Sequence, residues 1–216
     1  SEISGPHRGR GMAIGYWFNI GLKSAVIASV NADGTVHLVE GSTDIGGTRT
    51  TIAMQFAETL GLSAEDIYPS VGDTSAIGYT DVTGGSRVTY ATGWAAYEAA
   101  EDVKRQMIER ATILWELMPG QVEYADGIFR ATDGSRESTF KNLAAELEDT
   151  GGPVVGRATV HPDTGVGGSF AANIVDVEVD PETGKVTILR FTVIQDAGKA
   201  IHPSYVEGQM QGGSVQ

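Results

Sequence analysis

The chain has 216 residues and 41% of them are hydrophobic, so it is long enough to bury a substantial core, and this composition excludes a disordered protein. The formal net charge of −13 argues against a general affinity for nucleic acid or an anionic membrane, because those partners bind basic patches. Because cysteine is absent, the chain itself holds no disulfide, no cysteine-ligated iron–sulfur cluster and no cysteine-ligated zinc.

The first predicted element is a β-hairpin over residues 25–40, where apolar alternation flanks a turn at Asn31 to Gly34. Apolar residues at helical spacing over 52–60 then predict a helix that ends at Gly61. A longer apolar stripe predicts a helix over residues 86–117, with Pro119-Gly120 as its stop signal.

The second half adds a short strand pair around residues 125–127, a short helix over 140–147 and a clear hairpin over 175–194. Strands and helices are grouped rather than strictly alternating, so the predicted fold class is α+β, with β-hairpins packed against a long helix and shorter helices. No linker separates two domains, and residues 1–216 are expected to form a single structural unit. Gly212-Gly213 resembles a turn into a further segment, which predicts a chain truncated at its C-terminus.

Two segments, residues 46–49 and residues 84–87, repeat a Gly-Gly-Ser/Thr-Arg pattern. Each opens a predicted helix, where free N–H groups, a hydroxyl and the planar fork of Arg49 or Arg87 would suit a phosphate. Taken singly, each segment fits an ordinary helix start better, since Ser and Thr are favoured caps. Neither is a Walker loop or a dinucleotide fingerprint, so the generic phosphate interpretation is weak on its own.

The other polar residues indicate no second site. The four histidines are scattered without the paired spacing of a metal site, and His37 is predicted to be structural within a strand. Asp44 and Asp73 lie beside the glycine segments and are predicted to be caps or turn formers. Ser86 has no nucleophile elbow and no nearby histidine, which disfavours a serine hydrolase.

Taken in order, the motifs resemble the molybdenum hydroxylase family, which includes xanthine dehydrogenases, aldehyde oxidases and aerobic carbon monoxide dehydrogenases. Residues 9–13 (GRGMA), 41–48 (GSTDIGGT) and 83–87 (TGGSR, after GDT at 72–74) look like the family's segments. Residues 177–186 (VEVDPETGKV) and 207–216 extend the resemblance along most of the chain. The ordered set carries the resemblance, rather than any one motif.

The resemblance implies a molybdopterin-binding-domain-like fold and a molybdopterin-type molybdenum cofactor, in bacteria often its cytosine dinucleotide, held by glycine-rich loops. The complete enzyme is expected to oxidise an aldehyde or heteroaromatic substrate with water-derived oxygen, with the metal carrying the chemistry. Iron–sulfur and FAD groups are expected on other subunits or domains, and the location is expected to be cytoplasmic unless a targeting segment lies outside this piece. The cofactor-binding residues carried over are Gly46, Gly47, Thr48, Thr83, Gly84, Gly85, Ser86, Arg87 and Gln216.

The chain departs from the family pattern at Gly47, where the family usually has a glutamine near the metal's ligands. The family's catalytic glutamate lies in a Gly-Glu motif beyond the last residue, so no catalytic or metal-binding residue is assigned and the piece alone is expected to be inactive. Two alternatives stay open. One is a non-catalytic scaffold or assembly domain of the same fold, and the other is an unrelated phosphoryl-ligand module based only on the repeated glycine segments.

Overall fold

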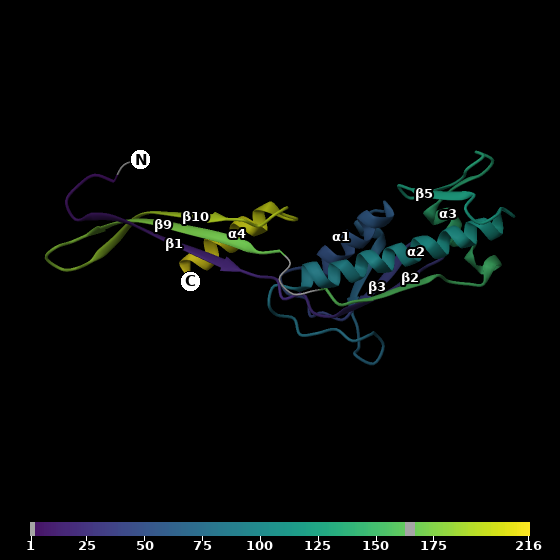
Figure 1. Cartoon of the computed structure of the whole chain (residues 1–216), viewed down its shortest axis with the longest axis horizontal. Helices are drawn as coiled ribbons and strands as arrows, with labels where there is room; N and C mark the ends of the chain where they lie inside the picture. Colours follow the sequence, from purple (N-terminus) through teal and green to yellow (C-terminus); the bar gives the residue numbers. More distant parts are fainter. Residues whose placement is uncertain (1–2, 163–166) are drawn as a thin grey trace. The chain divides into compact units, whose positions relative to one another are not determined.

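A computed structural model describes residues 3–162 and 167–216 of the chain. Its contacts divide the chain into two compact units: unit 1, Ser1–Phe18 with Gly165–Gln216, and unit 2, Asn19–Thr164. The sequence had indicated one structural unit because no linker stands out between residues 1 and 216. Each unit is therefore described by itself, with the elements labelled in Figure 1.

Unit 2 is built on a four-stranded sheet with the strand order β4-β3-β2-β8. The predicted hairpin of residues 25–40 is confirmed as β2 (Ser24–Val30) paired antiparallel with β3 (Val36–Glu40). Strand β4 (Ile67–Val71) pairs parallel with β3, and β8 (Val155–Val160) pairs antiparallel with β2. Because β3 and β4 are parallel, the loops that follow them leave from the same edge of the sheet.

Two helices cover this sheet and close the core of unit 2 (Figure 1). Helix α1 (Thr48–Leu60) packs on β4, helix α2 (Gly93–Leu114) packs on β2 and β8, and the two helices pack on each other. Gly61 ends α1 as predicted, with a φ of 64° and its N–H donating to carbonyl groups of the last turn. Small residues of α2, among them Ala95, Ala96 and Ala99, are fully buried, which lets the helix lie close to its neighbours.

The predicted start of the long helix at Ser86 is wrong. Ser86 has a φ of 55°, and the chain then makes a wide π-helical turn, η2 (Val88–Thr92), before α2 begins at Gly93. The apolar spacing continues through this turn, so the pattern could not separate a π turn from an α-helix. Such turns occur frequently at functional sites.

The rest of unit 2 confirms the predicted short strand pair and third helix. Strand β5 (Val122–Ala125) pairs with β6 (Ile128–Ala131), which pairs with β7 (Glu137–Thr139), and α3 (Phe140–Ala145) follows directly. Thr139 caps α3, because its side chain accepts a hydrogen bond from the N–H of Asn142. Two short 3-10 segments, η1 (Ala64–Asp66) and η3 (Leu147–Thr150), complete the unit.

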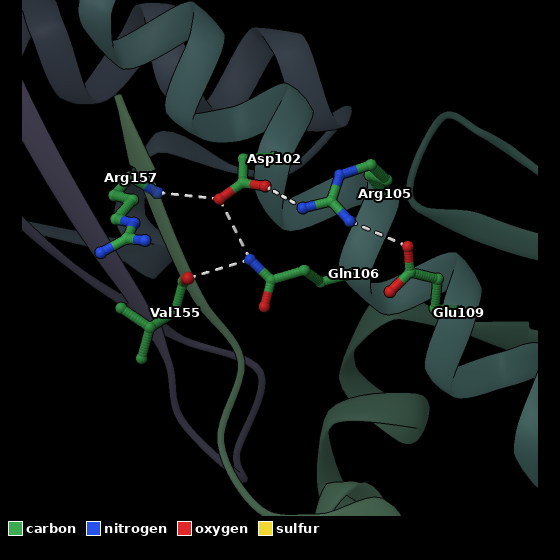
Figure 2. Close-up of polar contacts among 6 residues, drawn as sticks. All are labelled: Asp102, Arg105, Gln106, Glu109, Val155 and Arg157. Atoms are coloured by element: carbon green, nitrogen blue, oxygen red, sulfur yellow. Dashed lines mark hydrogen bonds and ion pairs between the residues drawn. The ribbon is translucent and has the colours of Figure 1, made fainter. Parts of the chain in front are cut away.

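Strand β8 lies at one end of the four-stranded sheet, and side chains of α2 contact its outer backbone groups (Figure 2). The N–H of Arg157 donates to Asp102 Oδ2 over 3.1 Å, and Gln106 Nε2 donates to the carbonyl of Val155 over 2.9 Å. Gln106 also donates to Asp102, and Arg105 forms ion pairs with Asp102 and Glu109. These contacts fix α2 against the edge of the sheet.

Unit 1 is a three-stranded antiparallel sheet in the order β1-β9-β10 with one helix. The predicted second hairpin is confirmed as β9 (Ser169–Val179) and β10 (Val186–Gln195), and β1 (Arg8–Trp17) pairs with β9. Asp176 on β9 is almost fully buried and accepts hydrogen bonds from Arg10 and Arg190 on the two flanking strands. The Arg10 guanidinium, helped by that of Arg190, lowers the pKa of the Asp176 carboxyl.

Helix α4 (Pro203–Val215) packs on β10 and contains the glycine pair at 212–213. The predicted glycine turn there is therefore wrong, since both residues lie inside a helix with Pro203 in its first turn. Across the described residues, none of the helices is both long and apolar enough to span a bilayer.

Candidate functional site: two adjacent glycine loops in unit 2

The two Gly-Gly-Ser/Thr-Arg segments lie in neighbouring loops of unit 2. We call residues 41–48 the first loop, which joins β3 to α1, and residues 80–87 the second loop, which precedes the π turn. The N–H of Thr43 in the first loop donates to Thr83 Oγ1 in the second loop over 3.0 Å. Gly41 lies against Thr80, since a Cβ added at Gly41 would be 2.4 Å from Thr80 Oγ1. The fold thus brings two distant segments of the sequence together.

Three of the predicted cofactor-binding glycines face open space. A Cβ added at Gly46, Gly47 or Gly84 would meet no heavy atom within 4 Å. Gly46 and Gly47 have φ values of 64° and 88°, in the left-handed region that glycine adopts without strain. A ligand can therefore approach the backbone at these positions closely, which side chains would otherwise prevent.

Asp44 occupies the N-terminus of α1. Its Oδ1 accepts hydrogen bonds from the N–H of Arg49 over 3.1 Å and from the hydroxyl of Thr48 over 3.3 Å. The Arg49 N–H, with smaller contributions from the Thr48 hydroxyl and the Arg49 charge, lowers the pKa of this carboxyl. The predicted capping role of Asp44 is confirmed. The Gly47 N–H also lies toward this carboxylate. An incoming anion would therefore meet Gly46 and Gly84 rather than the first turn of α1, where a carboxylate already lies.

Arg87 lies inside the protein rather than on the loop surface. Its side chain is fully buried, with Nε donating to the carbonyl of Gly21 over 2.8 Å and Nη2 to that of Lys23 over 2.7 Å. Nη1 donates to the carbonyl of Asp81 over 3.2 Å, and Nη2 also contacts Ser24 Oγ. The predicted guanidinium fork to phosphate is therefore wrong for Arg87. Its donors hold the second loop to the start of β2, and Arg49 is the exposed arginine of the pair, about half exposed and paired with Asp44 at 3.7 Å.

Gly85 and Ser86 anchor the second loop on the segment that precedes β2. The carbonyl of Gly85 accepts from the N–H of Ile20 over 3.1 Å, and that of Ser86 accepts from Asn19 Nδ2 over 3.0 Å. A Cβ added at Gly85 would lie 2.5 Å from Ile20 Cγ2, and the φ of Gly85 is 67°, so this position requires glycine on two counts.

Glu40 is a buried acid at the base of the first loop that the sequence did not single out. Its side chain is fully buried, Oε2 accepts from the N–H of Ser42 over 2.6 Å, and Oε1 has no hydrogen-bond partner. Burial raises the pKa of this carboxyl from its ordinary 4.5 to about 7, against the opposing effect of the Ser42 hydrogen bonds. The signal was present, because Glu40 is in phase with the buried Val36 and Leu38 on β3.

The remaining predicted residues have simpler positions. Asp73 forms the expected turn by accepting from the N–H of Ser75 over 2.7 Å, and His37 contacts Ser70 across β3 and β4 at 3.1 Å, as a structural residue would. Gln216 belongs to unit 1, where it ends α4, and its binding role stays a prediction separate from the loop pair.

No group of three or more His, Cys, Asp or Glu side chains suited to a metal ion occurs in residues 3–162 or 167–216. An open hollow of about 1160 Å³ lies along α2 and β8 and includes Glu101, Arg105 and His161 in its lining. It contains none of the predicted cofactor-binding residues. Volume alone therefore does not identify the site, and the exposed glycines of the two loops are the better candidates for a bound group.

Comparison with known proteins gives one consistent answer. A family profile described as a molybdopterin cofactor-binding domain matches residues 2–216. The chain is 30% identical to the aldehyde oxidoreductase molybdenum-binding subunit of Escherichia coli strain K12, over 94% of this chain and 27% of that protein. It is 28% identical to the gamma subunit of the 6-hydroxypseudooxynicotine dehydrogenase complex of Paenarthrobacter nicotinovorans, over 91% of this chain and 26% of the relative.

Among solved structures, the fold is similar to that of carbon monoxide dehydrogenase from Oligotropha carboxidovorans, with a TM-score of 0.80 and 25% identity. That match covers 95% of this chain and 28% of the other. The chain thus spans about a quarter of the length of the relatives it matches. The predicted α+β fold and the family resemblance are both confirmed, and the chain belongs to the molybdopterin cofactor-binding domain family.

Proposed function

We propose that the two glycine loops of unit 2 hold part of a molybdopterin cofactor, in its cytosine dinucleotide form, within the large subunit of a molybdenum hydroxylase. The observation that carries this proposal is the pairing of the loops through Thr43 and Thr83, with Gly46, Gly47 and Gly84 open beside them. Backbone N–H groups in such loops bind phosphate and pterin oxygens without needing a positive side chain. This suits a chain of formal net charge −13.

The loop residues fit the group in different ways. Gly46 and Gly84 would offer N–H groups at close range, and the exposed Ser86 would offer a hydroxyl. Gly47 would leave room for the group, because its own N–H already lies toward Asp44. Thr48 and Thr83 would act mainly by holding the loops, because their hydroxyls already contact Asp44 and the N–H of Thr43. Arg87 would act only through the position it gives the second loop. The binding role of Gln216, which ends α4 in unit 1, stays a separate prediction.

When bound, the cofactor would supply the oxidation chemistry, taking two electrons from an aldehyde or heteroaromatic substrate that gains a water-derived oxygen. This chain's own residues would bind and orient that group, and we assign none of them a catalytic role. The electrons would pass to iron–sulfur and flavin subunits or domains, consistent with relatives that are named as subunits of larger complexes. The 216-residue chain alone would be inactive, and its cytoplasmic location stays a prediction.

The test is elemental and pterin analysis of the complete subunit, purified with its partners. We expect about one molybdenum per subunit and a cytosine nucleotide released by acid hydrolysis. A Gly46→Val variant should lose both, because the side chain would fill the open space and strain a φ of 64°. Absence of both from the natural protein, in a host that loads a control enzyme, would refute the proposal and leave a scaffold.

A further inference from the structure

A chain of buried hydroxyl groups joins the two glycine loops below their surface. Ser42 Oγ of the first loop lies 2.7 Å from Thr92 Oγ1, and Thr92 Oγ1 lies 2.9 Å from Ser24 Oγ. Ser24 Oγ in turn contacts Nη2 of Arg87, the last residue of the second loop. Thr92, in the π turn before α2, therefore stands midway between the loops.

With the hydrogen bond from the N–H of Ser42 to Glu40, these contacts connect all the fully buried polar side chains described in unit 2. Ser24, Glu40, Ser42, Arg87 and Thr92 each have 0% exposed surface. Buried polar groups cost stability unless they are hydrogen-bonded, so five of them in one connected set indicate an arrangement that the fold keeps for a reason other than packing.

The donor is fixed only at the Arg87 end of these hydroxyls. Arg87 can only donate, so Ser24 Oγ accepts from it, while either hydroxyl can be the donor in the Ser24–Thr92 and Thr92–Ser42 contacts. At the other end, the N–H of Ser42 donates to Glu40 Oε2 over 2.6 Å. A buried cation and a buried acid thus stand at opposite ends of three connected hydroxyls.

Other charged groups lie near Glu40 and Arg87, outside the connected set of hydroxyls. The charges of Asp44 and Arg49, at the start of α1, act on Glu40, and the charge of Asp81, in the second loop, acts on Arg87. None of these three is fully buried. The hydroxyls are therefore the buried connection between the loops, and Thr92 is its central member.

We propose that Thr92, with Ser42 and Ser24, is a positioning residue that sets the distance between the two glycine loops and so the fit of the molybdopterin cofactor. This inference rests on the proposed function. Removing the Thr92 hydroxyl would interrupt the connected hydroxyls at their centre, while the exposed loop residues themselves stay unchanged. The Thr43–Thr83 contact would then be the remaining described hydrogen bond from the first loop to the second.

The experiment compares Thr92→Val with Thr92→Ser and Thr112→Val in the complete subunit with its partners. Valine keeps the shape of threonine without the hydroxyl, and serine restores the hydroxyl. Thr112 on α2 is the matched control, because the described hydrogen bond of its hydroxyl goes to the carbonyl of Ile108 in its own helix, over 2.8 Å. Two quantities are measured in each variant: the rate at which molybdenum and pterin are lost on dialysis, and the hydrogen exchange of the amides of residues 41–48 and 80–87.

We expect Thr92→Val to raise both the loss rate and the exchange of both loops about tenfold, as the loss of a buried hydrogen bond predicts. Thr92→Ser should restore both, and Thr112→Val should change neither. Unchanged loop exchange in Thr92→Val would overturn the inference, as would faster exchange with unchanged cofactor retention. If the wild-type subunit contains no cofactor, the proposed function fails, and unchanged exchange would still separately refute the hydroxyl connection.

Discussion

Replacing Glu40 with glutamine should remove a pH dependence from the stability of unit 2. Burial raises the pKa of Glu40 to about 7 in the folded chain, against 4.5 ordinarily. A carboxyl group with a raised folded pKa adds stability that is fully present below its unfolded pKa and is lost as the pH rises through the folded pKa. The gap between the two values corresponds to about 3 kcal/mol. Between pH 5 and pH 8 the chain should lose most of this stabilisation.

Glutamine cannot ionise, but its side-chain oxygen can still accept from the N–H of Ser42. The free energy of unfolding of Glu40→Gln, relative to wild type, should therefore rise by about 2 to 3 kcal/mol from pH 5 to pH 8. Urea unfolding at the two pH values measures this, followed by the fluorescence of Trp94 and Trp115 in unit 2 with Trp17 replaced by Phe in every variant. Exposed Glu58 on α1 gives the control, Glu58→Gln.

A difference between Glu40→Gln and wild type that is the same at both pH values would refute this reasoning. It would mean that the carboxyl group keeps its charge in the folded chain over the whole range, with its unpartnered Oε1 stabilised by a group outside the described contacts. A shift of the same size in Glu58→Gln would assign the pH dependence to the unfolded state instead.

Two further pairs of variants test the loops, both by the midpoint of urea unfolding. Gly85→Ala should destabilise unit 2 by about 2 kcal/mol, because alanine is strained at a φ of 67° and meets Ile20, whereas Gly84→Ala should change stability by less than about 0.5 kcal/mol. Equal effects would contradict the described backbone. Arg87→Lys should cost about 3 kcal/mol, because lysine cannot satisfy the separate carbonyls that the guanidinium reaches, while the half-exposed Arg49→Lys should cost less than about 1 kcal/mol. A small destabilisation by Arg87→Lys would show that those carbonyls have other donors.

The hairpins could be predicted from the sequence because their alternation and turn residues are local. Strand β1 could not, since it is exposed along its length and contains three glycines, and its pairing with β9 joins segments more than 150 residues apart. Alternation did place Glu40 in phase with the core of β3, but its charge argued for a surface position. The N–H of Ser42, which the fold places beside the carboxyl group, satisfies one of its oxygens there.

The loop pair shows the same division. Adjacent glycines and hydroxyls predicted two related segments, and their closeness follows from the packing of α1 on α2. The role of Arg87 could not be read locally, because its acceptors are carbonyl groups about 60 residues earlier in the chain and in its own loop. A Gly-Gly-Ser-Arg motif predicts an arginine that binds phosphate only where the guanidinium is not already bonded to carbonyl groups in the interior.

The contacts of Asp102 and Gln106 with strand β8 also bear on self-association. A strand at the end of a sheet offers unpaired N–H and C=O groups to which another chain can add, and this is a common route to aggregation. At Arg157 and Val155 those groups are already bound by side chains of α2 (Figure 2). While the subunit is being synthesised, this stretch of β8 therefore gives a second copy little to pair with once α2 has folded beside it.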